Sequence, residues 1–204
     1  HNEQSVRTVD ILEKDGEGLN LTWEVRDGIL NHQTADMPST LEGKIVRLSD
    51  KIAYTYHDMD DAIRAGILKS NDVPREIGEV VGYTPRERLN HFIHDIVTQS
   101  REKDDICMSP EVDQALKALR RFMFDAVYSN PIAKSEEHKA EALVETLYEH
   151  YMKHPDGLPK FFLELSFRGE PREQVVCDYI SSMTDRFAIA VYDELYIPKC
   201  WMGY

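Results

Sequence analysis

Apolar residues recur at the three-to-four-residue spacing of an α-helix along nearly the whole chain, and this periodicity constrains the fold more than any other feature. The clearest segment begins at the capping candidates Ser39 and Thr40 and carries apolar residues on one face until Gly66. No stretch shows the strong two-residue alternation that is typical of a strand. The sequence therefore predicts an all-α fold, in which a helical bundle is followed by a C-terminal helical extension.

Capping residues and prolines mark several further helix starts. Thr84 can cap a helix that has Pro85 at its first position and Glu87 three residues after the cap. A last long helix is expected from Pro171 through Leu195.

A few large or charged side chains can be assigned an environment from this pattern. Trp23 is expected in the core, whereas Arg120 and Arg121, in the middle of a helix, are expected to face solvent. Trp201 and Tyr204 are expected to dock the tail on the body of the protein or on another subunit.

Charge and cysteine content restrict the partners and the compartment. The 204 residues carry a formal net charge of −13, which repels nucleic-acid backbones and anionic membranes. A nucleotide triphosphate would also be repelled unless a metal ion or local Lys and Arg side chains reverse the sign at its site. The sequence contains no apolar run of about 18 residues, so no transmembrane helix is expected. Three scattered cysteines, Cys107, Cys177 and Cys200, argue against a disulfide framework, so a reduced cytoplasm is the simplest expectation.

The helix that follows Thr40 carries a pattern with possible chemistry. Asp50, Tyr54 and Asp58 lie at i, i+4 and i+8 on one stripe about 12 Å long, and Lys51 borders it. A carboxylate at Asp50 can bind a divalent metal, Lys51 can neutralise a phosphate, and Tyr54 and Asp58 can contact a sugar. The same residues would also be ordinary on a solvated helix face with i, i+4 partners, so spacing alone leaves both interpretations open.

Blocks of sequence along nearly the whole chain resemble the bacterial dGTPase-like branch of the HD superfamily of phosphohydrolases. The block around the stripe reads VRLSDKIAY, followed by HDMDDA. The matching blocks keep the order that they have in the family. They lie at residues 1–7, 18–29, 46–54, 57–62, 108–112 and 179–188.

This resemblance implies that the chain corresponds to the C-terminal two-thirds of such a protein. Residues 1–105 are then the C-terminal part of the HD catalytic domain, with an HD-domain-like helical bundle, and residues 106–204 are a helical C-terminal region that packs on it and takes part in assembly. It implies hydrolysis of a dNTP to deoxynucleoside and inorganic triphosphate in a homo-oligomer. It also implies a divalent metal (Mg, Mn, Fe, Ni or Zn) held by an H…HD…D set.

The resemblance assigns roles to individual residues as well. Asp50 is the last aspartate of the metal set, Lys51 contacts the phosphates, and Tyr54 and Asp58 face the deoxyribose. His1 matches a histidine with a proton-transfer role near the scissile phosphate, although a residue at the chain end can also be a frayed terminus.

The first His and the HD pair of the family's metal set have no match in this sequence. Two His-Asp dipeptides, His57-Asp58 and His94-Asp95, lack the flanking pattern and are interpreted as coincidences. The chain is therefore expected to supply one metal ligand of four. It is a fragment, as its lack of an initial Met favours, or one of two separate chains, or a degenerate relative that binds nucleotides as a regulatory module without hydrolysis.

Overall fold

A computed structural model describes residues 1–33 and 35–200, and the regular elements of this part of the chain are helices without exception. The expected all-α fold is thereby confirmed. Trp201 and Tyr204 lie outside the described residues. Within them, no helix combines the length and the apolar character that crossing a bilayer requires.

The chain divides by its packing into two compact units, His1–Lys134 and Ser135–Tyr204. The expected division after residue 105 differs from this one, because helix α7 (Pro110–Met123) and the π-helical turn η2 (Phe124–Tyr128) pack within the first unit. Each unit is described below by itself.

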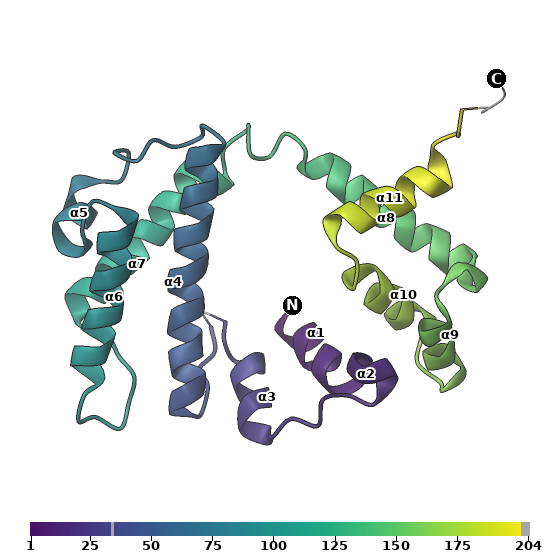
Figure 1. The fold of residues 1–204 in the computed structure, drawn as a ribbon, viewed down its shortest axis with the longest axis horizontal. Helices are drawn as coiled ribbons and strands as arrows, with labels where there is room; N and C mark the ends of the chain where they lie inside the picture. The colour runs from purple at the N-terminus through teal and green to yellow at the C-terminus, as the bar shows by residue number, and fades with distance from the viewer. Residues whose placement is uncertain (34, 201–204) are drawn as a thin grey trace. The chain divides into compact units, whose positions relative to one another are not determined.

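The first unit opens with short helices that lead to one long helix. The short elements are α1 (Asn2–Arg7), η1 (Thr8–Leu12), α2 (Glu13–Gly16) and α3 (Trp23–Leu30). The long helix α4 (Leu41–Arg64) starts where Thr40 accepts a hydrogen bond from the backbone amide of Gly43. Helix α3 packs on the N-terminal half of α4 (Figure 1).

The C-terminal half of α4 belongs to a bundle with α5 (Arg75–Val81), α6 (Pro85–Ser100) and α7 (Figure 1). The predicted capping box is present at the start of α6, where Thr84 and Glu87 satisfy each other's backbone amides. One apolar core holds the bundle together. Its buried members are Ile52, Met59, Ala62, Leu68, Ile77, Val81, Phe92, Val112, Ala115, Leu116, Leu119, Met123 and Val127.

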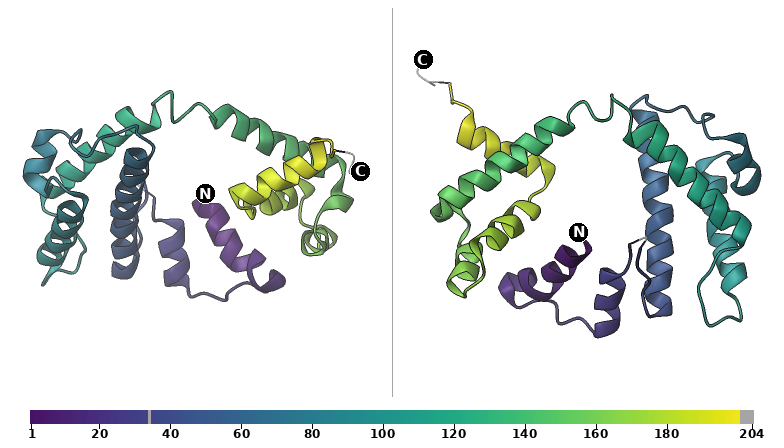
Figure 2. Two further views of the ribbon diagram at one scale, coloured as in Figure 1. Left: turned by 45° about the horizontal axis from the view of Figure 1, so that its top comes forward. Right: turned by 180° about the vertical axis from the view of Figure 1, so that it is seen from behind.

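The second unit is built on α8 (Glu137–Lys153), which packs against α10 (Arg172–Ser181) and α11 (Asp185–Tyr196), while α9 (Lys160–Phe167) packs on α10 (Figure 2). The expectation of a single long helix from Pro171 through Leu195 is wrong. The segment forms two helices, because α10 ends at Ser181 and Thr184 caps α11 by accepting a hydrogen bond from the amide of Phe187 at 3.2 Å.

Candidate functional site

Helix α4 positions the predicted stripe, and its register gives each residue a different degree of burial. Lys51 is buried, Tyr54 and Asp58 are half-buried, and Asp50 is exposed. The stripe therefore descends from the surface of α4 into the contact between α4 and α7.

Lys51 lies among other cations. Burial, followed by the charges of Arg47 and Arg120, lowers the pKa of Lys51 to about 8, and Lys117 adds to this effect while Asp113 opposes it. Lysines and arginines from α4 and α7 thus converge in a chain whose net charge is −13. Such a concentration of positive charge suits the binding of an anionic ligand along α4.

Arg120 covers the ring of Tyr54, with its guanidinium carbon 5.5 Å from the ring centroid. Burial raises the pKa of the Tyr54 hydroxyl. The expectation that Arg120 and Arg121 both face solvent is therefore wrong for Arg120, which is half-buried against Tyr54, whereas Arg121 is exposed.

Asp58 has a partner from η2, which follows α7. The hydroxyl of Tyr128 donates a hydrogen bond to a carboxylate oxygen of Asp58. Burial, and then this bond, raise the pKa of Tyr128, which keeps the phenol protonated and able to donate. The carboxylate of Asp58 is thereby oriented while its remaining lone pairs stay available for a ligand hydroxyl.

A pocket of about 460 Å³, here called the α4–α7 pocket, is bordered by Tyr54, Arg120 and Tyr128, whereas Lys51 and Asp58 are not among its lining residues. It has cationic groups, two tyrosines and an apolar floor, which suits a ligand with both charged and flat parts. It is lined by Tyr54, Thr55, Lys117, Arg120, Arg121, Met123, Phe124 and Tyr128.

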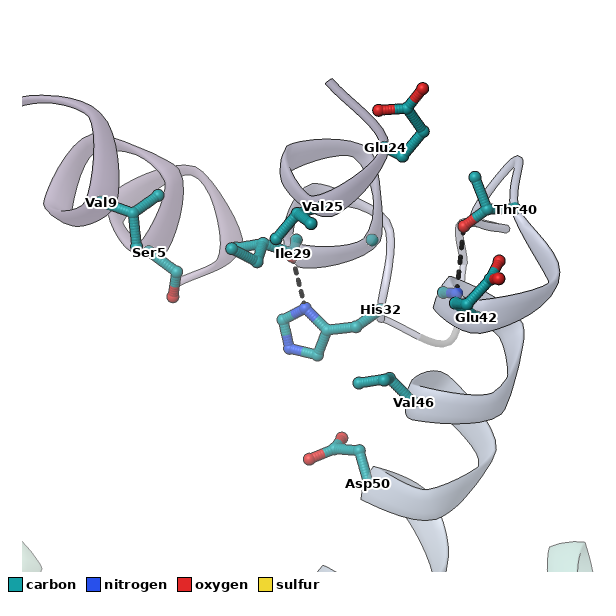
Figure 3. A pocket seen from close by; sticks show the side chains of 12 residues that line it. Ser5, Val9, Glu24, Val25, Ile29, His32, Thr40, Glu42, Val46 and Asp50 are labelled. Carbon is teal, nitrogen blue, oxygen red and sulfur yellow. Dashed lines mark hydrogen bonds between the residues drawn. The ribbon is translucent and has the colours of Figure 1, made fainter. Parts of the chain in front are cut away.

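Asp50 lines a second pocket of about 700 Å³, here called the α3–α4 pocket (Figure 3). The stripe is thus shared between two pockets rather than enclosed in one. The α3–α4 pocket is lined by Ser5, Val9, Glu24, Val25, Gly28, Ile29, His32, Thr40, Glu42, Gly43, Val46 and Asp50.

His1 lies against His32, which lines the α3–α4 pocket. Its Nε2 atom is 3.1 Å from Nε2 of His32, and Nδ1 of His32 is 2.7 Å from the carbonyl oxygen of Ile29. If His32 donates from Nδ1, its Nε2 accepts a hydrogen bond from His1. The proton-transfer role of His1 stays a prediction.

A divalent ion needs more ligands than Asp50 alone provides. Among residues 1–33 and 35–200, no three His, Cys, Asp or Glu side chains are grouped so that they could hold a metal ion. Because a single carboxylate binds such an ion weakly, this part of the chain does not by itself fit the metal that the resemblance implies.

Three residues of the α4–α7 pocket, Lys117, Arg120 and Tyr128, were not among the sequence-predicted site residues. The sequence carries a weak signal for this face of the helix. Polar and aromatic side chains recur there every three or four residues, at Lys117, Arg121, Phe124 and Tyr128. That signal becomes informative only when α7 is known to pack on α4.

Comparison with known families places the second half of the chain in a defined class. Residues 106–194 match the family model of the phosphohydrolase-associated domain. This match begins in the first packing unit, just before α7, and extends through most of the second.

Whole-chain relatives narrow this class. A deoxyguanosinetriphosphate triphosphohydrolase-like protein of Caldanaerobacter subterraneus subsp. tengcongensis is 45% identical over 201 residues, which cover 98% of this chain and 59% of the relative. Proteins with the same description from Clostridium perfringens (40% identity; 98% and 60% covered) and Desulfatibacillum aliphaticivorans (39%; 97% and 62%) are also similar. The chain resembles this dGTPase-like family of phosphohydrolases over nearly its whole length, and it spans about 60% of the length of the curated relatives that it matches.

Proposed function

We propose that this chain supplies the nucleotide-binding part of a hydrolase that converts a dNTP, with dGTP as the first candidate, to deoxynucleoside and inorganic triphosphate. The observation that supports this most is the α4–α7 pocket. Its lining residue Arg120 covers Tyr54 and acts electrostatically on the buried Lys51, and its lining residue Tyr128 donates a hydrogen bond to Asp58. Lys51 and Asp58 are seven residues apart on α4, which corresponds to a rise of about 10 Å along the helix. A polyphosphate and a sugar can be bound at the two ends of that span.

The side chains that line the pocket and the neighbouring Lys51 and Asp58 have complementary roles in this proposal. Lys51 and Arg120 stabilise negative charge on the phosphates as it redistributes during reaction. The ring of Tyr54 packs near C2′ of the deoxyribose and leaves little room for a 2′-hydroxyl. Asp58, oriented by Tyr128, accepts a hydrogen bond from the 3′-hydroxyl.

The proposed reaction is the attack of water on the α-phosphorus. The new bond joins the water oxygen to phosphorus, and the bond between phosphorus and the 5′ oxygen breaks. The leaving 5′ oxygen takes up a proton, for which His1 is the candidate donor. This balance gives a deoxynucleoside and inorganic triphosphate, rather than a monophosphate and pyrophosphate.

The metal requirement is proposed from the family resemblance, with Asp50 as one ligand. Because the described residues do not form a metal site by themselves, the remaining ligands would have to come from outside this sequence. Adding Mg²⁺, Mn²⁺, Fe²⁺, Ni²⁺ or Zn²⁺ singly after chelation measures whether, and with which ion, activity is restored.

The test is a product assay on the natural protein that contains this segment. Each of the four dNTPs is incubated with the protein, and deoxynucleoside and triphosphate are quantified by ion chromatography. Equal amounts of the two products support the proposal. Phosphate, pyrophosphate or no product from every dNTP would exclude it.

A second candidate function is nucleotide binding without hydrolysis. The α4–α7 pocket supports it, because binding of a nucleotide needs the pocket residues of this chain but not the metal ligands. Saturable dGTP binding in calorimetry, with no triphosphate release under any of the ions, would identify this function.

A further inference from the structure

Two histidines at the C-terminal end of α8 lie side by side in the second unit. His150 and His154 are four residues apart, and their ring centroids are 5.1 Å apart. His150 belongs to the last turn of α8, and His154 directly follows its last residue. Two histidines at i and i+4 can bind the same metal ion, as they do in the zinc-binding HExxH motif. The pair is therefore a candidate chelating site.

The spacing of the two rings suits one ion between them. Zn²⁺ binds an imidazole nitrogen at about 2.1 Å, which puts the ion roughly 3.2 Å from the ring centroid. Rings whose centroids are 5.1 Å apart then subtend about 105° at the ion, close to the tetrahedral angle that Zn²⁺ adopts in proteins. The two imidazoles can therefore occupy neighbouring positions around one ion while keeping this spacing.

Both histidines line a pocket of about 510 Å³, which has room for an ion and for water. Glu145 and Glu149 also line it, as does Tyr196 of α11. The single lysine of the pocket, Lys153, is paired with Glu149 at 2.9 Å. The C-terminal end of a helix adds a partial negative charge from its carbonyl groups. The surroundings of the two rings therefore favour a cation over an anion.

An imidazole must be uncharged to bind a metal ion. Burial, followed by the charge of His154, lowers the pKa of His150, whereas Asp156 opposes these effects. At neutral pH the ring of His150 is therefore uncharged in a larger fraction of molecules than a free histidine is.

We propose that His150 and His154 form a binding site for a divalent transition-metal ion of the class of Zn²⁺, which prefers imidazole ligands. Among the described residues, no third His, Cys, Asp or Glu completes a metal-binding group with them, so water fills the other positions around the ion. The bound ion links the last turn of α8 to the start of the turn η3 (Pro155–Gly157). This inference does not rest on the proposed function, because it concerns the second unit and is tested without an activity measurement.

The first test uses the natural protein without substitutions. Diethyl pyrocarbonate acylates uncharged imidazoles, and mass spectrometry measures the yield at each histidine after chelation, with added Zn²⁺ and with added Mg²⁺. We expect Zn²⁺ to lower the yield at His150 and His154 at least several-fold, because coordination occupies the reactive lone pair. His138, an exposed histidine of α8 that does not line the pocket, should keep its yield.

Mg²⁺ should protect neither ring, because it prefers oxygen ligands. Unchanged yields at His150 and His154 with Zn²⁺, equal protection of His138, or equal protection by Mg²⁺ would overturn the proposal.

A second test counts the bound ions by titration calorimetry with Zn²⁺. His150→Gln and His154→Gln should each bind one ion fewer per chain than the unsubstituted protein, at Zn²⁺ concentrations that saturate the latter. His138→Gln is the matched control and should bind the same number as the unsubstituted protein. All four proteins share every other metal site, so ions bound elsewhere cancel in the comparison. An unchanged count in either pocket variant would overturn the proposal.

Discussion

At the scale of single residues, the proposal depends most on Arg120, because its guanidinium covers Tyr54 and its charge contributes to the lowered pKa of Lys51. We expect Arg120→Ala to weaken dGTP binding by about ten-fold or more, since a charge-assisted hydrogen bond contributes roughly 1.5–3 kcal/mol. Isothermal titration of the natural protein measures the change in Kd. Arg101→Ala is the control, because Arg101 is exposed and does not line the α4–α7 pocket, and equal losses in the two variants would contradict a specific role for Arg120.

A separate prediction concerns the proposed contact between Asp58 and the sugar. If its carboxylate holds the 3′-hydroxyl, the enzyme discriminates dGTP from 2′,3′-dideoxy-GTP, and Asp58→Ala removes that discrimination. We expect kcat/KM for dGTP to fall about 10- to 100-fold in the variant, with a much smaller change for the dideoxy analogue. Asp60→Ala is the comparison, because Asp60 pairs with Arg64 on the same helix. Full kcat/KM for dGTP in Asp58→Ala would make the sugar role wrong.

At the scale of helices, the contact between α3 and α4 is set by two glycines. A Cβ atom at Gly43 would lie 2.6 Å from the Cβ of the buried Pro38, whereas one at Gly28 would lie 3.5 Å from the Cα of Gly43. We expect Gly43→Ala to reduce the free energy of unfolding by roughly 1–3 kcal/mol through overpacking. Gly28→Ala should be neutral or stabilising by up to about 1 kcal/mol, because alanine favours the helix. Urea denaturation of both variants checks the difference in sign, and equal destabilisation would contradict this account of the contact.

The contact between α8 and α11 is expected to depend on pH. The ring of His150 lies 5.1 Å from that of His154 and 5.9 Å from that of Tyr196. Burial lowers the pKa of His150, the charge of His154 lowers it further, and Asp156 opposes these effects. A base whose pKa is lower in the folded state is protonated first in the unfolded chain, so stability is lost as pH falls below about 6.5.

Hydrogen exchange of the α8 and α11 amides, compared at about pH 7.5 and about pH 5.5, measures this effect. His150→Gln should flatten the dependence, whereas His138→Gln, an exposed histidine on the same helix, should retain it. An unchanged dependence in His150→Gln would exclude His150 as its source.

The helices show which structural information is local in the sequence. The start of α6 could be predicted because Thr84, Pro85 and Glu87 act within one turn. The break between α10 and α11 was missed because neither Gly nor Pro marks it, and Thr184 is a weak cap signal within an apolar pattern. The expectation that Trp23 is in the core is also wrong, since its side chain is 60% exposed in this chain.

The residues of the candidate site also divide into those that the sequence could predict and those that it could not. Asp50, Lys51, Tyr54 and Asp58 could be grouped from the sequence because one helix carries them at regular spacing. The partners from α7 and η2 could not be assigned, because the sequence does not say which turns of these elements meet α4. The pairing of Asp58 with Tyr128 joins residues 70 positions apart, and such contacts are fixed only by tertiary packing.

At the scale of the whole molecule, the exposed apolar side chains of the second unit support the expectation of a homo-oligomer. Helix α11 has no buried residue, and Phe187 and Ile189 on it are 48% and 54% exposed. An amphipathic helix whose apolar side chains are this exposed presents an apolar surface to solvent, which is typical of contact sites. We therefore expect the natural protein to have a mass of several chains in light scattering at micromolar concentration.

Replacing Phe187 and Ile189 together by Glu should reduce that mass, because buried charges at an apolar interface are costly. Val97→Glu, which adds a charge at an exposed valine of α6, should leave it unchanged. A monomeric natural protein would contradict the homo-oligomer itself. An oligomer that survives the double substitution would instead exclude the α11 face as its interface.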